Sequence, residues 1–111
     1  MEFIGLLLPD ALAGMIATGK IDVLDVRSDA EWREGRIKEA GHIYTGDLER
    51  RVNEVPKDRP IACICSTGMR ASLAASILKR SGVKTVYNVL GGIAAWKKKD
   101  YPLVYERLLE K

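Results

Sequence analysis

Long apolar runs are missing from this sequence of 111 residues. A helix that spans a bilayer needs about 20 consecutive apolar residues, whereas the run over residues 3–8 is short and ends at Pro9-Asp10. No basic segment precedes that run and no clear cleavage site follows it, so we do not interpret it as a signal peptide. We therefore expect a cytoplasmic protein that does not associate with a membrane.

Cysteine and histidine are scarce. The two cysteines, Cys63 and Cys65, are one residue apart, and such close neighbours rarely form a structural disulfide, so both thiols are expected to stay reduced. Two cysteines and the single histidine, His42, do not make a four-ligand zinc site. We expect no metal site, and we interpret His42 as a structural residue.

A strong charge of one sign is also absent. Lys and Arg number 18 against 15 Asp and Glu, a net charge of +3. Basic residues are spread along the chain except in the run 97–99, which is typical of a solvated helix end. This balance excludes a nucleic-acid-binding arm, and it weakly favours an anionic substrate. With 47% hydrophobic residues and no internal repeat, residues 1–111 are expected to form one globular domain.

Strands and helices are expected to alternate along the chain. Pro9 suits the first turn of a helix, and Ser28 with Glu31 forms a capping-box pattern. The expected strands are 21–26, 43–44, 61–64 and 85–89. The expected helices are 9–19, 28–35, 47–55, one from the loop after Cys65 to about Arg80, 93–99 and a tail helix 103–111. This alternation predicts an α/β fold with an open, mostly parallel sheet flanked by helices, whose ligands bind beyond the carboxyl ends of the strands.

The loop that follows the expected strand 61–64 has the pattern Cys-x-x-Gly-x-Arg and runs into a helix. Unpaired N–H groups and the positive end of the helix dipole favour an anion at such a junction. Four residues separate Cys65 from Arg70, one fewer than in Cys-dependent phosphatases, so the loop suits one sulfur atom better than a phosphate group. The candidate nucleophile is Cys65, and the candidate substrate-binding residues are Ser66, Thr67, Gly68, Met69 and Arg70.

Other residues receive supporting roles. Cys63 is interpreted as a buried core residue, with a resolving role for a Cys65 sulfenate or persulfide as the alternative. Asp25 and Arg27 are expected to form an internal brace under the loop. Trp32 and Trp96 are expected to be core or lid anchors, and Gly91-Gly92 is expected to shape a turn beside the site rather than a phosphate-binding loop.

The sequence resembles the rhodanese family over residues 21–102. The resemblance rests on five stretches in order, followed by Tyr101-Pro102: Leu-Asp-Val-Arg at 24–27, Glu-Trp-Arg-Glu-Gly-Arg-Ile at 31–37, Ala-Gly-His-Ile at 40–43, Cys-Ser-Thr-Gly-Met-Arg at 65–70, and Asn-Val-Leu-Gly-Gly-Ile-Ala-Ala-Trp at 88–96. Arg36 stands where the family usually has His, and Lys38-Glu39 where it has Pro-Gly. The loop's second residue, Ser66, is not basic, which weakens the case for thiosulfate as preferred donor.

The resemblance implies a five-stranded rhodanese-like sheet and a sulfurtransferase. The Cys65 thiolate would take a sulfane sulfur from thiosulfate, a persulfide or a polysulfide, and would pass it to cyanide, a thiol or a protein acceptor. No cofactor would be needed, and Arg70 would hold the donor's negative end. Two alternatives remain: a sulfur-carrier, sensing or docking module with little turnover, and a small phosphatase or arsenate reductase, which the short loop and Ala71 disfavour.

Overall fold

The structure is a computed structural model that describes residues 3–105, and it contains one five-stranded sheet. The strands are β1 (Gly5–Leu7), β2 (Asp22–Asp25), β3 (Ala40–His42), β4 (Ile61–Ile64) and β5 (Val86–Val89). Their order in the sheet is β1-β5-β4-β2-β3, and every neighbouring pair is parallel. The predicted α/β class with a parallel sheet is confirmed.

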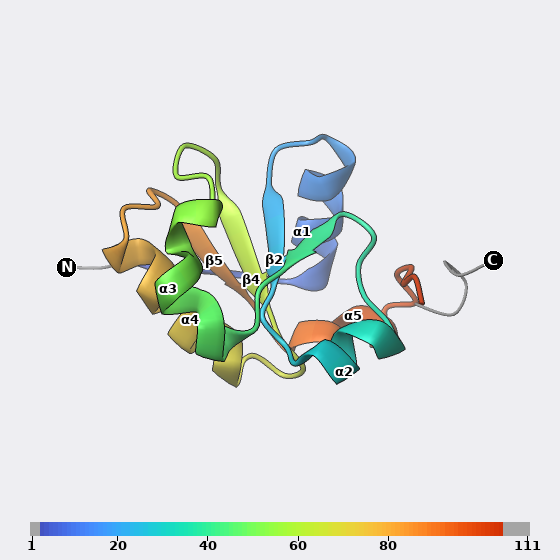
Figure 1. Cartoon of the computed structure of the whole chain (residues 1–111). Helices are drawn as coiled ribbons and strands as arrows, with labels where there is room; N and C mark the ends of the chain where they lie inside the picture. The colour runs from blue at the N-terminus through green and yellow to red at the C-terminus, as the bar shows by residue number, and fades with distance from the viewer. Residues whose placement is uncertain (1–2, 106–111) are drawn as a thin grey trace.

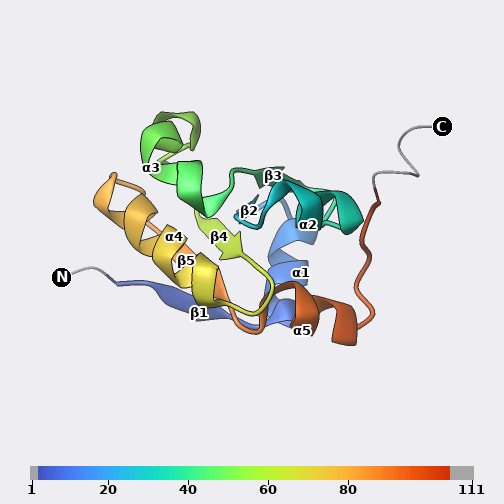
Figure 2. The ribbon, with the colours of Figure 1, turned by 60° about the horizontal axis from the view of Figure 1, so that its bottom comes forward.

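Helices cover both faces of this sheet (Figures 1 and 2). α3 (Leu48–Arg51) and α4 (Met69–Arg80) lie on one face, whereas α1 (Pro9–Ala17) and α5 (Gly92–Lys98) lie on the other. α2 (Asp29–Glu34) follows β2, and short 3-10 turns at Thr45–Asp47 and Val52–Glu54 flank α3. No helix within residues 3–105 is long and apolar enough to cross a membrane.

The central strand β4 leads directly to the candidate site. All four residues of β4 are buried, as expected for an apolar strand of a parallel sheet that helices cover on both faces. α4 then packs back on β4 and β5 through the predicted apolar stripe, whose members are all buried: Ala71, Ala74, Ala75, Ile77 and Leu78. The loop between β4 and α4 is therefore fixed at both ends by core packing.

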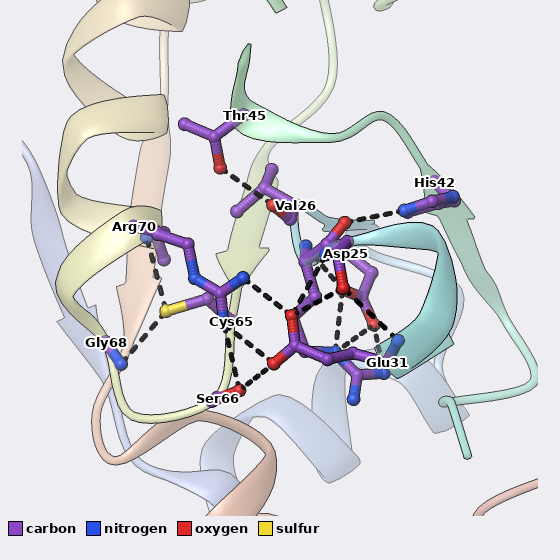
Figure 3. Close-up of polar contacts among 12 residues, drawn as sticks. Asp25, Val26, Glu31, His42, Thr45, Cys65, Ser66, Gly68 and Arg70 are labelled. Carbon is purple, nitrogen blue, oxygen red and sulfur yellow. Dashed lines mark hydrogen bonds and ion pairs between the residues drawn. The ribbon is translucent and has the colours of Figure 1, made fainter. Parts of the chain in front are cut away.

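The capping box at the start of α2 is present as predicted. The Ser28 hydroxyl accepts a hydrogen bond from the Glu31 N–H, and a Glu31 carboxylate oxygen accepts one from the Ser28 N–H. α2 ends at Gly35, also as predicted. This arrangement places the Glu31 side chain at the first turn of the helix, on the side that faces the candidate site (Figure 3).

Several boundaries differ from the sequence expectation. β1 was not predicted, because the apolar run at its position has no alternating pattern and becomes a strand only by pairing with β5. The strand expected at 43–44 instead covers Ala40–His42. The helix expected over 47–55 is a single α-turn between two 3-10 turns, and Pro56 disfavours helical geometry at Val55.

The predicted tail helix is wrong where the structure describes it. Residues 103–105 are not helical, and the backbone of Val104 forms an antiparallel bridge with Arg36 through two hydrogen bonds of 2.8 and 3.0 Å. Pro102, just before this segment, carries no N–H group and restricts its neighbour. The rest of the expected helix, residues 106–111, lies outside the described residues.

Candidate active site

The Cys65 sulfur lies in a cradle of backbone N–H groups (Figure 3). The N–H of Gly68 donates to Sγ at 3.0 Å and the N–H of Ala71 donates to it at 3.3 Å. Cys65 is only 1% exposed, and it sits at the N-terminal end of the 12-residue helix α4. Two N–H donors and the positive end of the helix dipole converge on this sulfur, so the cradle can stabilise an anionic sulfur species.

The loop backbone depends on Gly68. Its φ of +117° is in the region that favours glycine, and this turn directs the Gly68 N–H at the sulfur. From β5, the Asn88 side-chain amide donates to the Gly68 carbonyl at 3.1 Å. The loop is thereby tied to the neighbouring strand as well as to its own helix.

The N-terminus of α5 supports the other half of the loop. The N–H groups of Ile93 and Ala94 donate to the carbonyl oxygens of Cys65 and Ser66 at 2.8 and 3.1 Å. Gly92 makes this approach possible, because an added Cβ would lie 2.6 Å from the Ser66 carbonyl oxygen and closer still to that of Cys65. Gly91-Gly92 thus forms the turn beside the site that the sequence indicated.

The Arg70 guanidinium is held by Glu31 in a two-point ion pair. Its two terminal nitrogens lie 2.7 and 2.9 Å from the Glu31 carboxylate oxygens. The Ser66 hydroxyl completes this group, since it donates to Glu31 at 2.6 Å and accepts from Arg70 at 3.0 Å. Sequence reasoning assigned Glu31 only to the capping box, and no local signal joins two residues 39 positions apart.

The charges in this group stabilise one another. The Arg70 guanidinium holds the pKa of Glu31 far below its usual value. Burial raises this pKa by less than Arg70 lowers it, and hydrogen bonds from Ser66 and Ser28 each lower it further. Glu31 in turn raises the pKa of Arg70. The positive charge that the sequence assigned to a donor anion is therefore shared with a carboxylate of the chain itself.

The predicted internal ion pair of Asp25 and Arg27 is present, and it contacts the end of α2 rather than the Cys65 loop. Asp25 and Arg27 are buried, and their side chains are joined by hydrogen bonds of 2.8 to 3.1 Å. Arg27 also donates to the Gly35 carbonyl at 2.6 Å. The pair ties the C-terminal end of α2 to the end of β2.

His42 and Trp96 have the structural positions expected of them, whereas Trp32 is half-buried and lies outside both core clusters. His42 Nε2 lies 2.8 Å from the Arg27 carbonyl oxygen, and the His42 ring stacks on Trp32 at 4.7 Å. The guanidinium of Arg36 lies over the same Trp32 ring at 4.5 Å, so Arg36 takes part in packing rather than facing the sulfur. Trp96 is buried in the core cluster between the sheet and α1.

The remaining loop residues face outward. Thr67 and Met69 are exposed, and Met69 is 84% exposed. A hollow of about 290 Å³ lies beside Ser66 and Thr67, and it is bordered by Glu34, Lys97 and Leu103. A second hollow, of about 330 Å³, lies along β2 and β3 and contains none of the loop residues. Within residues 3–105, no three metal-ligating side chains lie together.

The parallel sheet and the cysteine loop at a strand–helix junction define an α/β protein built around a buried, hydrogen-bonded sulfur. A sequence profile described as "Rhodanese-like domain" matches residues 8–99. The chain belongs to this family of rhodanese-like domains.

Individual relatives agree with that assignment. The chain is 38% identical over 86 residues to the Bacillus subtilis (strain 168) protein "Putative sulfurtransferase YtwF", which covers 78% of this chain and 82% of that protein. It is 37% identical over 79 residues to "Putative sulfur carrier protein YrkF" of the same organism, covering 71% of this chain but only 43% of that protein. A crystal structure of a rhodanese-related protein from Thermoplasma volcanium superposes with a TM-score of 0.83 at 29% identity, over 92% of this chain and 98% of the other.

Proposed function

We propose that the protein is a sulfurtransferase in which Cys65 carries the transferred sulfur as a persulfide. The observation that carries this proposal is the pair of N–H groups, from Gly68 and Ala71, directed at the buried Sγ atom. A cysteine in an ordinary core has no such donors, and buried thiols without them stay protonated. The cradle can stabilise the persulfide anion that the first step of the reaction forms.

The reaction has two displacement steps. In the first, the Cys65 thiolate attacks the outer sulfane sulfur of the donor. The bond between that sulfur and the rest of the donor breaks, and its electron pair leaves with the reduced donor. In the second, a thiolate or cyanide attacks the terminal sulfur of the Cys65 persulfide. The S–S bond breaks, and its electron pair restores the Cys65 thiolate.

Among donors, a persulfide or polysulfide fits this site better than thiosulfate. The Arg70 fork is occupied by Glu31, and Ser66 adds no positive charge to the loop. A dianion such as thiosulfate must compete with a carboxylate that already holds two hydrogen bonds. A persulfide carries one negative charge, and a polysulfide spreads its charge along a chain of sulfur atoms without the compact sulfonate group that would need the Arg70 fork. Ser66, Thr67, Gly68 and Met69 complete the proposed substrate-binding loop.

The proposal extends to the organisation of the protein. We regard residues 1–111 as one domain that works without a metal or an organic cofactor, because the two displacement steps need only a nucleophile and anion-stabilising donors. The two free cysteines suit a reducing compartment such as the cytoplasm. The partners are a small anionic sulfur donor and a thiol, cyanide or protein acceptor.

The second candidate function is a sulfur-carrier, sensing or docking module with little turnover. It is favoured by the relative that is described as a sulfur carrier and by the burial of Cys65. The two functions share the loaded Cys65 persulfide and differ in whether the sulfur is passed on rapidly. Turnover with a small acceptor therefore distinguishes them.

The test is the intact mass of the protein after incubation with thiosulfate or, separately, with an inorganic polysulfide. We expect a gain of one sulfur atom with polysulfide, less with thiosulfate, and none in a Cys65→Ser variant. Cyanide should remove the added sulfur. Loading without rapid removal would favour the carrier function, and no loading with either donor would refute the sulfurtransferase proposal.

A further inference from the structure

Large apolar side chains are exposed around the Cys65 loop. The structure has eight exposed large hydrophobic residues within residues 3–105. Four of them are Met69 and Leu73 of α4, Leu6 of β1 and Leu90 just after β5. We call these four residues the docking face. Single exposed apolar residues are ordinary, but a group of them beside a reactive centre indicates an interaction surface.

Hydrogen bonds and strand register connect the sheet edge to the loop. Leu6 pairs in register with Asn88, and neighbours in register point to the same side of a sheet. The Asn88 side chain reaches the Gly68 carbonyl, so Leu6 also faces the side of α4. Leu90 lies beside Gly68, because an added Cβ at Gly68 would be about 4 Å from Val89 and Gly91.

The other end of the docking face follows α4. Leu73 is one turn beyond Met69, and Arg80 lies on the same exposed stripe because helical positions i, i+4 and i+11 share a face. At a rise of 1.5 Å per residue, Arg80 is about 16 Å from Met69. Arg80 is exposed and belongs to a helix with three basic and no acidic residues.

This surface therefore carries a positive charge about 16 Å along α4 from Met69. Arg70 is neutralised by Glu31, whereas Arg80 has no ion-pair partner within residues 3–105. β1 and β5 contribute no charged residue. A matching partner would present apolar residues near its reactive thiol and acidic residues about 16 Å away.

We propose that the docking face binds a protein sulfur acceptor whose cysteine lies in an apolar segment with acidic residues opposite Arg80. This inference rests on the proposed sulfurtransferase function, and it names the class of acceptor. A small thiol or cyanide needs no apolar surface outside the loop. A protein thiol must approach a sulfur that is almost fully buried, and exposed apolar side chains beside the loop can hold it there.

The test compares sulfur transfer from the persulfide-loaded protein to synthetic peptides and to cyanide. The first peptide carries one cysteine flanked by leucines, with aspartates near its far end. In the second peptide the leucines are replaced by serine, and in the third the aspartates are replaced by lysine. We expect the first peptide to react about tenfold faster than the second, because burial of a few apolar groups gives an advantage of that size. The third should also be slower than the first, and salt should reduce that difference.

The matched protein variant is Leu73→Ser with Leu90→Ser, and the control is Phe3→Ser, which removes an exposed apolar side chain before β1. The double variant should lose the preference for the first peptide and keep its rate with cyanide, whereas Phe3→Ser should keep both. Far-ultraviolet circular dichroism establishes that the variants are folded.

Three other results would each overturn one part of the proposal. A peptide preference that survives in the double variant, with cyanide transfer intact, would overturn the docking face but not the sulfurtransferase function. Failure of the wild-type protein to transfer sulfur to cyanide would overturn the function itself. A wild-type dimer in sedimentation that the double variant converts to a monomer would show that the face binds a second copy of the chain, which overturns the proposed acceptor.

Discussion

The two cysteines of this protein occupy contrasting regions although only one residue separates them. Cys63 lies inside β4 and Cys65 lies just beyond its end, and both are buried, with exposures of 0% and 1%. Burial raises the pKa of the Cys63 thiol to about 12, and the nearby Cys65 adds to this effect. Within residues 3–105 no N–H group donates to the Cys63 sulfur, whereas two donate to that of Cys65. The supply of hydrogen-bond donors, rather than exposure, thus distinguishes the candidate nucleophile from a core residue.

The largest expected effect on sulfur transfer comes from removing the sulfur atom of each cysteine in turn. Cys65→Ser should reduce persulfide loading and transfer to cyanide to the uncatalysed background, because the attacking atom is lost. Cys63→Ala should retain loading at close to the wild-type rate, and it should lose about 1 kcal/mol of stability from the small cavity that it creates. Intact-mass loading and urea unfolding measure the two effects. Equal losses of transfer in both variants would contradict the division of roles.

The next largest effect should come from the backbone support of the loop. Gly92→Ala places a methyl group against the carbonyl oxygens of Cys65 and Ser66, and its φ of +57° is unfavourable for alanine. We expect a loss of about 3 kcal/mol in the free energy of unfolding and a severe loss of sulfur transfer.

Gly14→Ala is the control for that change, because an added Cβ there meets nothing within 4 Å and Gly14 lies inside α1. It should raise the stability by about 0.5–1 kcal/mol and leave transfer unchanged. A Gly92→Ala variant with native stability and native activity would show that the contact between α5 and the loop is dispensable.

A smaller effect is expected where charge, rather than packing, supports the loop. In the wild-type protein the Glu31 carboxylate is paired with Arg70. Glu31→Gln removes this negative charge, so a thiosulfate dianion should bind Arg70 more readily. We expect the KM for thiosulfate to fall about fivefold, as for an ion pair of about 1 kcal/mol, with little change for polysulfide. Initial-rate kinetics with both donors measure this difference.

Glu54→Gln provides the matched control, because Glu54 makes a similar two-point ion pair with Arg51 and neither residue belongs to the loop. Its KM for both donors should equal that of the wild-type protein. An unchanged thiosulfate KM in Glu31→Gln would mean that the Arg70 fork does not receive the donor.

The smallest effect concerns the pH dependence of the core cysteine. Folding raises the pKa of Cys63 from 9.0 to about 12, so the folded state holds this proton more tightly than the unfolded state. The free energy of unfolding should therefore decrease as the pH rises above 9 and toward 12. Cys63→Ala should remove part of that decrease in urea unfolding series at pH 8 to 10.5. Identical slopes for the two proteins would contradict the raised pKa.

Much of the site could be predicted because its signals are local in the sequence. The strand before Cys65, the buried stripe of α4 and the Ser28 capping box each depend on residues within one element, and all three are present. β1 escaped prediction because a three-residue edge strand has no periodicity of its own and exists through its pairing with β5. The tail was predicted wrongly because residues 103–105 take their geometry from a bridge with Arg36.

The sequence by itself determined the class of fold, the position of Cys65 at a strand–helix junction and the glycine that lets the loop turn. Periodicity, capping and backbone freedom act over a few residues, so they can be recognised without a structure. Only the tertiary structure decided that Glu31 holds Arg70, that Gly92 packs against the Cys65 carbonyl, and that Leu6 faces the same side of the sheet as α4. Those contacts join distant segments, and they form only when the parallel sheet brings the ends of its strands together.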